Sequence, residues 1–324
     1  MQNETPIPLV SIIIPLFNAE SYVDKAIECV LNQTYQNIEI LVVNDGSTDN
    51  SLTVAKQFES NQVKIFDQSN KGASAARNFG FLKSKGQFIK FFDADDLMNL
   101  EMIEEQVKMA LKHPNAIISA KWGRFFNNDI STFKIKNTET NHDLMPIDWI
   151  CEAWKNAKPM HQCGIFLLPR QIIEIAGIWD ESLSLNDDME FFTKNILASQ
   201  GVFFCKKGIL YYRSGLGNSN LSSSTNIKAI ESHFKSIDKS TNYLLEKKKD
   251  SYTLKLIADI WQKFVYDAYQ FHKDLALIGE DKVIQYGGSE LRIHGGRRLL
   301  IFTKLFGWKL ALKIDYLIKT KIKL

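Results

Sequence analysis

The sequence lacks several features that would place it in a simple class. No apolar run approaches the roughly 18 residues that a membrane-spanning helix needs, and the net charge over 324 residues is only +3. There is no Gly-x-x-x-x-Gly-Lys-Ser/Thr segment, and no Gly-x-Gly-x-x-Gly follows an early strand pattern. These absences argue against a membrane-spanning chain, a P-loop enzyme and a classical dinucleotide-binding fold. The small charge gives no sign of nucleic acid as a partner.

Cysteine is scarce and scattered. The four cysteines, Cys29, Cys151, Cys163 and Cys205, show no Cys-x-x-Cys and no metal-type spacing. Disulfide frameworks belong to oxidising compartments, so we expect free thiols in a reducing one. The first eight residues are polar and lack the apolar core of a signal peptide. We therefore expect a cytoplasmic protein.

Strand and helix patterns alternate over the first 95 residues. Short apolar runs of the kind found in buried parallel strands are followed by apolar residues at helical spacing. The expected strands cover residues 9–14, 38–43 and 63–66, and the expected helices cover residues 22–33, 51–58 and 73–83. This order predicts a doubly wound α/β sheet. The chain is long enough for about two domains.

A fourth strand pattern, residues 88–97, ends in the carboxylates Asp93, Asp95 and Asp96. In an α/β sheet, ligands bind at the carboxyl ends of the strands. Neighbouring carboxylates repel each other unless a cation lies between them, and hard divalent cations prefer oxygen ligands. The alternative is a solvated turn that caps the next helix, because Asp is a good N-cap.

Four ordered segments carry a resemblance to a known family. They are Val-Ser-Ile-Ile-Ile-Pro-Leu-Phe-Asn at 10–18, Leu-Val-Val-Asn-Asp-Gly-Ser-Thr-Asp at 41–49, Lys-Gly-Ala-Ser-Ala-Ala-Arg-Asn at 71–78 and Asp-Ala-Asp-Asp at 93–96. Together they resemble glycosyltransferase family 2, over about residues 8–215. The resemblance implies a GT-A (Rossmann-like) mixed sheet flanked by helices. It also implies an inverting enzyme that uses a nucleotide-diphosphate sugar, most commonly a UDP-sugar, with Mg²⁺ or Mn²⁺.

The resemblance also implies residues on the donor side. Those that match the family's donor-binding positions are Pro15, Phe17, Glu20, Asp45, Lys71, Arg77, Asn78, Asp93, Ala94, Asp95 and Arg213. Asp93 and Asp95 correspond to the metal-binding Asp-x-Asp. The turn at 15–20 matches the family segment along the nucleoside, and Asp45 matches the carboxylate that contacts the base. Arg213 could pair with the diphosphate, and the polar loop at 218–224 could close over the donor. Asn44 stands where the family often has Asp. For Arg77 the alternative is a structural bridge to Asp93 or Asp45.

An inverting transfer needs one general base for the proton of the acceptor hydroxyl. The family carries Glu-Asp at this point, and the matching base here is Asp188, preceded by Asp187. Like-charge repulsion from Asp187 would raise the pKa of Asp188. The alternative is that both acids favour a helix N-terminus.

Beyond residue 98, the sequence predicts strands at 116–126 and 131–135 joined by a hairpin turn, and an apolar strand at 164–168.

The acceptor side is less defined by the sequence. Asp187, Trp179 and His161 are its candidates, although a lone His is more often structural. Many relatives place a metal-binding His after Arg213, and no His occurs here before residue 232. The expected acceptor is a glycan or a lipid-linked saccharide, as in surface polysaccharide synthesis.

Helical patterns dominate from residue 226 onward. The apolar residues from Ile257 to Ala268 follow helical spacing and are expected in the core rather than in a binding groove. The tail, residues 295–324, has eight Lys or Arg against the single acid Asp315. Its residues Ile301, Leu305, Trp308 and Leu312 would share one face of a continuous helix. Basic and apolar residues with Trp favour a helix on an anionic membrane surface. The alternatives are a homo-oligomer contact or packing on the rest of the chain.

We therefore expect three parts: residues 1–97 as the nucleotide-sugar half of a GT-A domain, residues 98–225 as the acceptor half, and residues 226–324 as a helical region. The predicted function is an inverting, metal-assisted glycosyltransferase, located in the cytoplasm or on the inner face of the membrane. A sugar-1-phosphate nucleotidyltransferase is a weaker alternative because the turn at 15–18 is not Gly/Arg-rich. A non-catalytic sugar-nucleotide or glycan-binding protein is the other alternative, although the expected carboxylates are all present.

Overall fold

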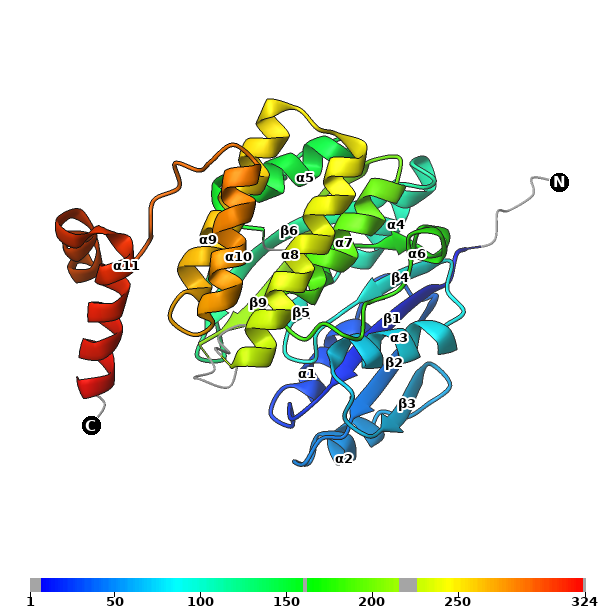
Figure 1. Cartoon of the computed structure of the whole chain (residues 1–324). Helices are drawn as coiled ribbons and strands as arrows, with labels where there is room; N and C mark the ends of the chain where they lie inside the picture. The colour runs from blue at the N-terminus through cyan, green and yellow to red at the C-terminus, as the bar shows by residue number, and fades with distance from the viewer. Residues whose placement is uncertain (1–6, 160–161, 216–225, 323–324) are drawn as a thin grey trace. The chain divides into compact units, whose positions relative to one another are not determined.

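The computed structural model describes residues 7–159, 162–215 and 226–322. The chain forms two compact units (Figure 1). The first comprises Met1–Ala153 with Met160–Ser223, and the second comprises Trp154–Pro159 with Ser224–Leu324. Each unit is described by itself.

The first unit contains a five-stranded sheet in the order β3-β2-β1-β4-β8. Its strands are β1 (Val10–Leu16), β2 (Ile38–Asp45), β3 (Val63–Gln68), β4 (Phe88–Phe91) and β8 (Leu168–Pro169). The first four run parallel, and β8 pairs antiparallel with β4. Strands β1 and β2 are almost wholly buried, as their continuous apolar runs predict. Because these strands are parallel, the loops after β1, β2 and β4 lie at the same edge of the sheet, where ligands bind in α/β sheets.

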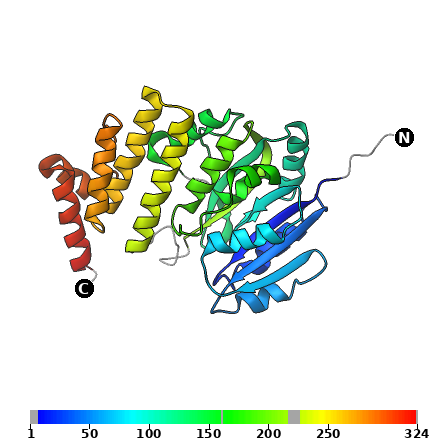
Figure 2. The same ribbon diagram turned by 45° about the vertical axis from the view of Figure 1, so that its right-hand side comes forward.

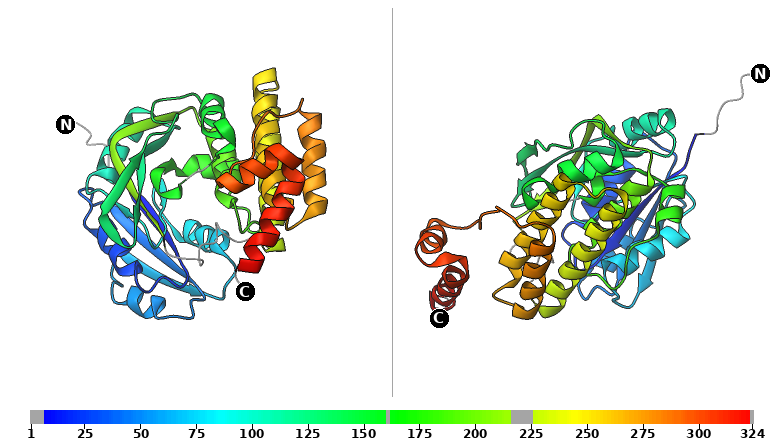
Figure 3. Two further views of the ribbon diagram at one scale, coloured as in Figure 1. Left: turned by 90° about the vertical axis from the view of Figure 1, so that its left-hand side faces the viewer. Right: turned by 45° about the horizontal axis from the view of Figure 1, so that its top comes forward.

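Three helices cover this sheet. They are α1 (Val23–Leu31), α2 (Ser51–Lys56) and α3 (Ala73–Lys83). Right-handed crossovers place α1 and α2 on one face and α3 on the other, because the chain reverses direction across the sheet after β3 (Figure 3). Helix α3 lies very close to β1: a Cβ at Gly80 would be 2.5 Å from Cγ2 of Ile13. Glycine at this position lets α3 approach the sheet.

A second sheet in the same unit has the order β5-β9-β6-β7. Its strands are β5 (Leu97–Met98), β9 (Val202–Ser214), β6 (Ile117–Phe126) and β7 (Asp129–Lys136). The β6–β7 hairpin matches the sequence prediction. The long strand β9 was not predicted. Both sheets together form the mixed α/β architecture of the GT-A fold.

One predicted strand is wrong in its first half. Of residues 164–168, the first two belong to the short 3₁₀ helix η2 (Cys163–Ile165), whereas Leu167 pairs with Ile118 and Leu168 begins β8. The buried ammonium of Lys90 lies against this segment and donates hydrogen bonds to the carbonyl oxygens of Gly164 (2.6 Å) and Phe166 (3.4 Å). These carbonyls are therefore satisfied by a side chain instead of a neighbouring strand.

The remaining helices of the first unit are α4 (Met102–Lys112), α5 (Pro146–Trp154), α6 (Arg170–Ala176) and α7 (Asp187–Ala198). Helix α7 carries a mostly buried run from Met189 to Ile196. Within it, Phe191 stacks on Trp179 with ring centroids 4.0 Å apart. This packing fixes the start of α7, where the predicted base lies.

The second unit is helical. It consists of the 3₁₀ helix η1 (Lys155–Ala157), α8 (Ile227–Lys247), α9 (Ser251–Ala268), α10 (Lys273–Gln285) and α11 (Arg297–Ile322). Helices α8, α9 and α10 lie side by side (Figure 2). The predicted apolar stripe of α9, from Ile257 to Ala268, is buried. Among the described residues, no helix combines the length and apolarity needed to cross a bilayer.

The prediction of one continuous apolar face in the tail is wrong. Gly307 has φ 74° and ψ 160°, so α11 is broken there into two helical segments. Trp308 is half-buried and packs beside Tyr266 and Tyr269, at ring-centroid distances of 5.0 and 5.1 Å. Ile301 and Leu305, on the segment before the break, are exposed.

Candidate active site

The turn after β1 is tied to the loop after β2. The side-chain oxygen of Asn18 accepts a hydrogen bond from the backbone N–H of Thr48 (2.8 Å), and Ser51 accepts from the N–H of Ala19 (2.7 Å). The carboxylate of Glu20 accepts from the N–H of Asn50 (2.8 Å). The segment predicted to lie along the nucleoside is therefore pre-organised by its neighbour. Within this segment, Pro15 still belongs to strand β1, and the side chain of Phe17 is exposed.

Asp45 organises the loop before α3. Its carboxylate accepts hydrogen bonds from the backbone N–H groups of Lys71 and Gly72, both at 2.8 Å, and from the Gln68 amide. Asp45 is 3% exposed, whereas the Lys71 side chain is exposed. The predicted contact of Asp45 with a nucleotide base stays a prediction, and its observed partners show that it also holds this loop in place.

Arg77 is the centre of the site. Its guanidinium donates to Asp93 (2.9 Å) and to Asp187 (3.1 Å), and its side chain is buried. The Trp179 ring lies against the guanidinium, with 4.4 Å between Cζ and the ring centroid. Ser74 donates a further hydrogen bond to Asp187 (2.8 Å). The proposed bridge from Arg77 to Asp93 is confirmed, and the partner on its other side is Asp187 instead of Asp45.

Asn78 and Trp179 are also buried here. The side-chain NH₂ group of Asn78 donates to the backbone carbonyl of Trp179 (2.9 Å) and to the carboxylate of Glu181 (2.8 Å). The side-chain oxygen of Asn78 accepts from the backbone N–H of Trp179 (2.9 Å). Trp179 is 2% exposed. These contacts fix the segment that leads to α7. Donor contact by Asn78 and acceptor contact by Trp179 stay predictions.

The acidic turn, residues 93–96, follows β4 and is supported by β9. Arg213 donates its backbone N–H to the Asp96 carboxylate (3.0 Å) and its Nε–H to the Asp95 carbonyl (2.6 Å). The same guanidinium also donates to Asn128. Asp96 is buried and does not cap a helix, because α4 begins only at Met102. The capping interpretation of Asp96 is therefore wrong, and the predicted contact of Arg213 with a diphosphate stays a prediction.

The acidic turn concentrates negative charge. Removal from water, followed by the nearby charge of Asp93, raises the pKa of Asp95 to about 6. Burial, then Asp95 and Asp93, also raises the pKa of Asp96. Buried carboxylates that lie close to one another are stabilised when they bind a proton or a cation. Ala94, between the two aspartates, is buried.

The residues of the turn fit a divalent cation that is shared with a ligand. Asp93 and Asp95 offer carboxylate oxygens, the donor type that Mg²⁺ prefers, and Mg²⁺ is commonly bound by one or two carboxylates plus substrate phosphates. In the described part of the chain, no group of three or more His, Cys, Asp or Glu side chains is arranged to hold a metal. The turn therefore fits a cation completed by a diphosphate and water, and not one held by protein alone.

Asp188 stands in the first turn of α7. Its carboxylate accepts a hydrogen bond from the N–H of Met189 (2.8 Å). Loss of water around the carboxylate is the largest cause that raises its pKa to about 7, and the charge of Asp187 is the next. The predicted direction of the Asp187 effect is confirmed, and desolvation adds a larger effect. Asp188 keeps part of its surface exposed to solvent, so it combines access with a pKa near neutrality.

One group of residues near the acidic turn was missed by the sequence analysis. Tyr212 packs edge-on against Trp122 (6.1 Å between centroids), and Arg124 lies over the Tyr212 ring at 5.1 Å and donates to Ser214 (3.0 Å). Burial raises the pKa of Tyr212, as do the carboxylates of the acidic turn. Trp122 and Arg124 are two apart on β6 and share one face. The spacing of two between Trp122 and Arg124 was the sequence signal that could have indicated this group.

Two parts of the predicted site lie outside the described residues. They are His161 and the polar loop that follows Gly215.

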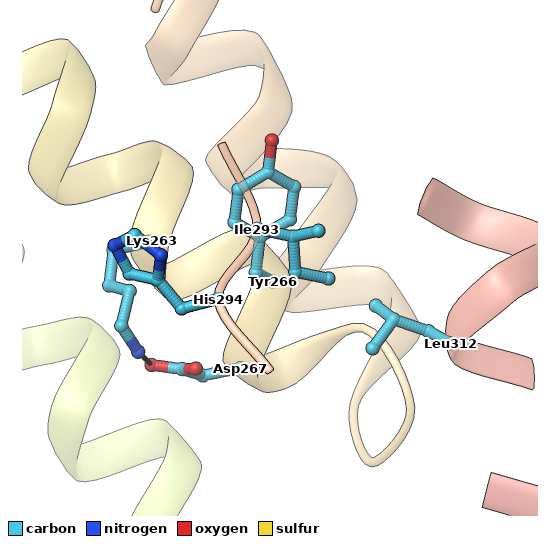
Figure 4. A pocket seen from close by; sticks show the side chains of 6 residues that line it. All are labelled: Lys263, Tyr266, Asp267, Ile293, His294 and Leu312. Atoms are coloured by element: carbon cyan, nitrogen blue, oxygen red, sulfur yellow. Dashed lines mark hydrogen bonds and ion pairs between the residues drawn. The ribbon is translucent and has the colours of Figure 1, made fainter. Parts of the chain in front are cut away.

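A small hollow occurs in the C-terminal unit (Figure 4). It has a volume of about 120 Å³. It is lined by Lys263, Tyr266, Asp267, Ile293, His294 and Leu312. Lys263 and Asp267 already form an ion pair there. Small-molecule sites usually measure roughly 300–1,000 Å³, so this hollow is too small for a nucleotide sugar.

Comparison with known proteins agrees with this arrangement. Residues 11–173 match the model of the family described as Glycosyl transferase family 2. This match covers about half of the 324 residues. The chain belongs to glycosyltransferase family 2, and it is a transferase by its family and relatives.

Individual relatives support the assignment over part of their length. An uncharacterized glycosyltransferase of Haemophilus influenzae is 41% identical over 109 residues, which are 33% of this chain and 44% of the relative. One of Rickettsia typhi is 31% identical over 205 residues, 63% of each chain. The glycosyltransferase GlyG of Streptococcus pneumoniae is 37% identical over 126 residues, 38% of this chain and 41% of GlyG. The chain thus spans less than two thirds of the length of each.

A solved structure confirms the fold. The crystal structure of Staphylococcus aureus TarS 1–349 in complex with UDP-GlcNAc aligns with a TM-score of 0.68. The alignment covers 94% of this chain and 90% of TarS 1–349, at 16% identity. The predicted GT-A fold, with a helical region after it, is therefore confirmed.

Proposed function

We propose that the chain transfers a sugar from a nucleotide-diphosphate donor to an acceptor hydroxyl with inversion at the anomeric carbon. The observation that carries the proposal is the bridge made by Arg77. It brings Asp93, at the end of a sheet strand where ligands bind, next to Asp187, the neighbour of the proposed base. The donor clamp and the base are thereby held in one site.

The proposed chemistry is a single displacement. Asp188 takes the proton of the acceptor hydroxyl, whose oxygen attacks the anomeric carbon as the bond to the diphosphate breaks. The bonding electrons leave with the nucleoside diphosphate. A pKa of about 7 suits Asp188 because the carboxylate is then both available and basic at neutral pH.

Asp93 and Asp95 would hold Mg²⁺ or Mn²⁺ against the diphosphate. A bound cation of this kind neutralises charge on the leaving group. Arg77 keeps the Asp93 carboxylate oriented, and Arg213 supports the turn through the Asp95 carbonyl and the Asp96 carboxylate.

We infer that the donor is a UDP-sugar. The TarS structure of similar fold contains UDP-GlcNAc. The turn after β1, which the family resemblance assigns to the nucleoside, is pre-organised by the loop after β2. We also propose residues 1–97 as the donor half and residues 98–225 as the acceptor half. In the acceptor half, Trp122 and Tyr212 provide aromatic surface next to the acidic turn. The acceptor class is a glycan or a lipid-linked saccharide.

A donor screen tests the proposal. The protein is incubated with UDP-, GDP- and TDP-sugars, a divalent cation and a membrane extract, and release of nucleoside diphosphate is measured. Release with one donor class, with a product whose anomeric configuration is inverted by NMR, supports the proposal. A product with retained configuration would contradict the single displacement with Asp188 as the base. If no donor binds or reacts, the proposal that the chain is a nucleotide-sugar-dependent transferase is wrong.

A further inference from the structure

The outer surface of α11 is apolar and basic. The break at Gly307 divides α11 into residues 297–306 and 308–322. The inner side packs on its own unit: Leu299, Ala311 and Ile293 are buried. Half-buried residues complete this cluster: Tyr266, Phe302, Trp308 and Leu312.

The opposite side of both segments exposes large apolar side chains. Leu305 is 65% exposed and Leu317 is 57% exposed. Other exposed apolar residues of α11 are Leu300, Ile301, Leu310 and Tyr316, together with Phe306, whose ring lies beside Phe302 of the inner cluster. On the first segment, Ile301 and Leu305 are four residues apart and share one face, and on the second segment Leu310 and Leu317, seven apart, do the same. Such a cluster on a water-soluble surface commonly marks an interaction site.

The charge on this surface has one sign. Asp315, the only acid in residues 295–324, is buried and paired with Arg298 (2.8 Å) and Lys319 (2.7 Å). Lys304 lies beside the leucines of the first segment, and Lys313 lies between Leu310 and Leu317 on the second. Both lysines are exposed, and neither has an ion-pair partner within the described ranges.

We propose that this surface of α11 docks on an anionic lipid bilayer. The leucines enter the boundary between headgroups and acyl chains, and the lysines bind lipid phosphates. A second copy of the chain fits less well, because a two-fold contact would place Lys304 and Lys313 against lysines of the same surface. The inference rests on α11 alone and does not depend on the transferase chemistry.

Vesicle binding by the full chain tests the proposal. Flotation is measured with phosphatidylcholine vesicles and with vesicles that also contain phosphatidylglycerol. We expect binding only to the anionic vesicles, with weaker binding at higher salt because exposed charges are screened. Lys304→Gln with Lys313→Gln, and separately Leu305→Ser with Leu310→Ser, should each weaken partitioning at least about tenfold.

A matched control changes the same residue types on α10. Lys273 and Leu277 are exposed there, so Lys273→Gln with Leu277→Ser should leave vesicle binding unchanged. Circular dichroism checks that all variants are folded. The proposal is overturned if the parent binds no anionic vesicles, or if the α11 variants bind like the parent. It is also overturned if the parent dimerises in sedimentation and only the leucine variant is monomeric.

Discussion

Asp93 and Asp187 share one guanidinium, that of Arg77, although Arg77 is separated from Asp187 by 110 positions in the sequence. Asp93 follows strand β4 and Asp187 begins helix α7. A single buried cation therefore balances one acid of the proposed donor clamp and one acid beside the proposed base. Arg77 therefore links the turn that is proposed to hold the donor diphosphate to the start of the helix that carries the proposed base.

Replacement of Arg77 should affect both stability and turnover. Arg77→Ala leaves Asp93 and Asp187 without their shared cation, and both are partly shielded from water. We expect a loss of about 2 kcal/mol in the free energy of unfolding, because a broken buried pair leaves uncompensated charge. Chemical denaturation measures the loss. Arg292→Ala, which removes an exposed arginine of the C-terminal unit, is the control. Equal stability of Arg77→Ala and the parent would contradict the bridging role.

Replacement of Asn78 should lower the free energy of unfolding of the protein even when no donor is present. Asn78→Ala removes three hydrogen bonds to Trp179 and Glu181. At about 1 kcal/mol per bond, the free energy of unfolding should fall by about 2–3 kcal/mol. Thermal or denaturant unfolding provides the measurement, with the exposed Asn242→Ala as the control. If only the KM for the donor rises and stability is unchanged, Asn78 is a donor contact instead of a loop anchor.

Removal of divalent cations should abolish nucleoside diphosphate release, and Mg²⁺ or Mn²⁺ should restore it. The reason is that Asp93 and Asp95 present paired oxygen donors where the leaving group would lie. Asp95→Asn should raise the cation concentration for half-maximal rate at least about tenfold, since a neutral amide binds cations more weakly. The exposed Asp129→Asn is the control. Full turnover in the presence of a chelator would exclude the metal from the reaction.

The rate should depend on the protonation of Asp188. Because its pKa is about 7 in the folded protein, the carboxyl is protonated below that pH and cannot accept a proton. We expect kcat/KM to fall about tenfold per pH unit on the acid side and to level off above pH 7. Asp187→Asn removes a neighbouring negative charge, so the pKa of Asp188 falls and the acid limb moves to lower pH. An acid limb that does not move would mean that another group is titrating.

The sequence predicted the donor half of the fold closely, because its strands are continuous apolar runs separated by clear helix periods. Helix α3 was predicted with both ends correct. Strand β9 was missed because residues 206–208 form a bulge between Cys205 and Ile209, opposite Ala120 and Lys121, which interrupts the strand pattern. The break at Gly307 was missed because a single glycine does not by itself end a helical pattern.

The candidate site was predicted in its residue types, but of its contacts only the bridge from Arg77 to Asp93 was predicted. The motifs identified Arg77, Asp93 and Asp187, but local periodicity cannot show that residues from α3, the acidic turn and α7 meet. That meeting depends on how the two sheets and α7 pack. The pKa of Asp188 illustrates the same limit: its neighbour Asp187 is visible in the sequence, whereas the larger effect, desolvation, arises only in the folded unit.

The most direct test of the central claim compares donor binding and sugar transfer for Asp188→Asn. The variant keeps the size of the side chain and removes its basicity, so binding of UDP or the donor by calorimetry should stay within about threefold of the parent. Transfer should fall by about 10²–10⁴, the usual contribution of a general base. Asp281→Asn on the exposed face of α10 serves as the control and should behave like the parent. Parent-like transfer by Asp188→Asn would contradict the assignment of Asp188 as the base.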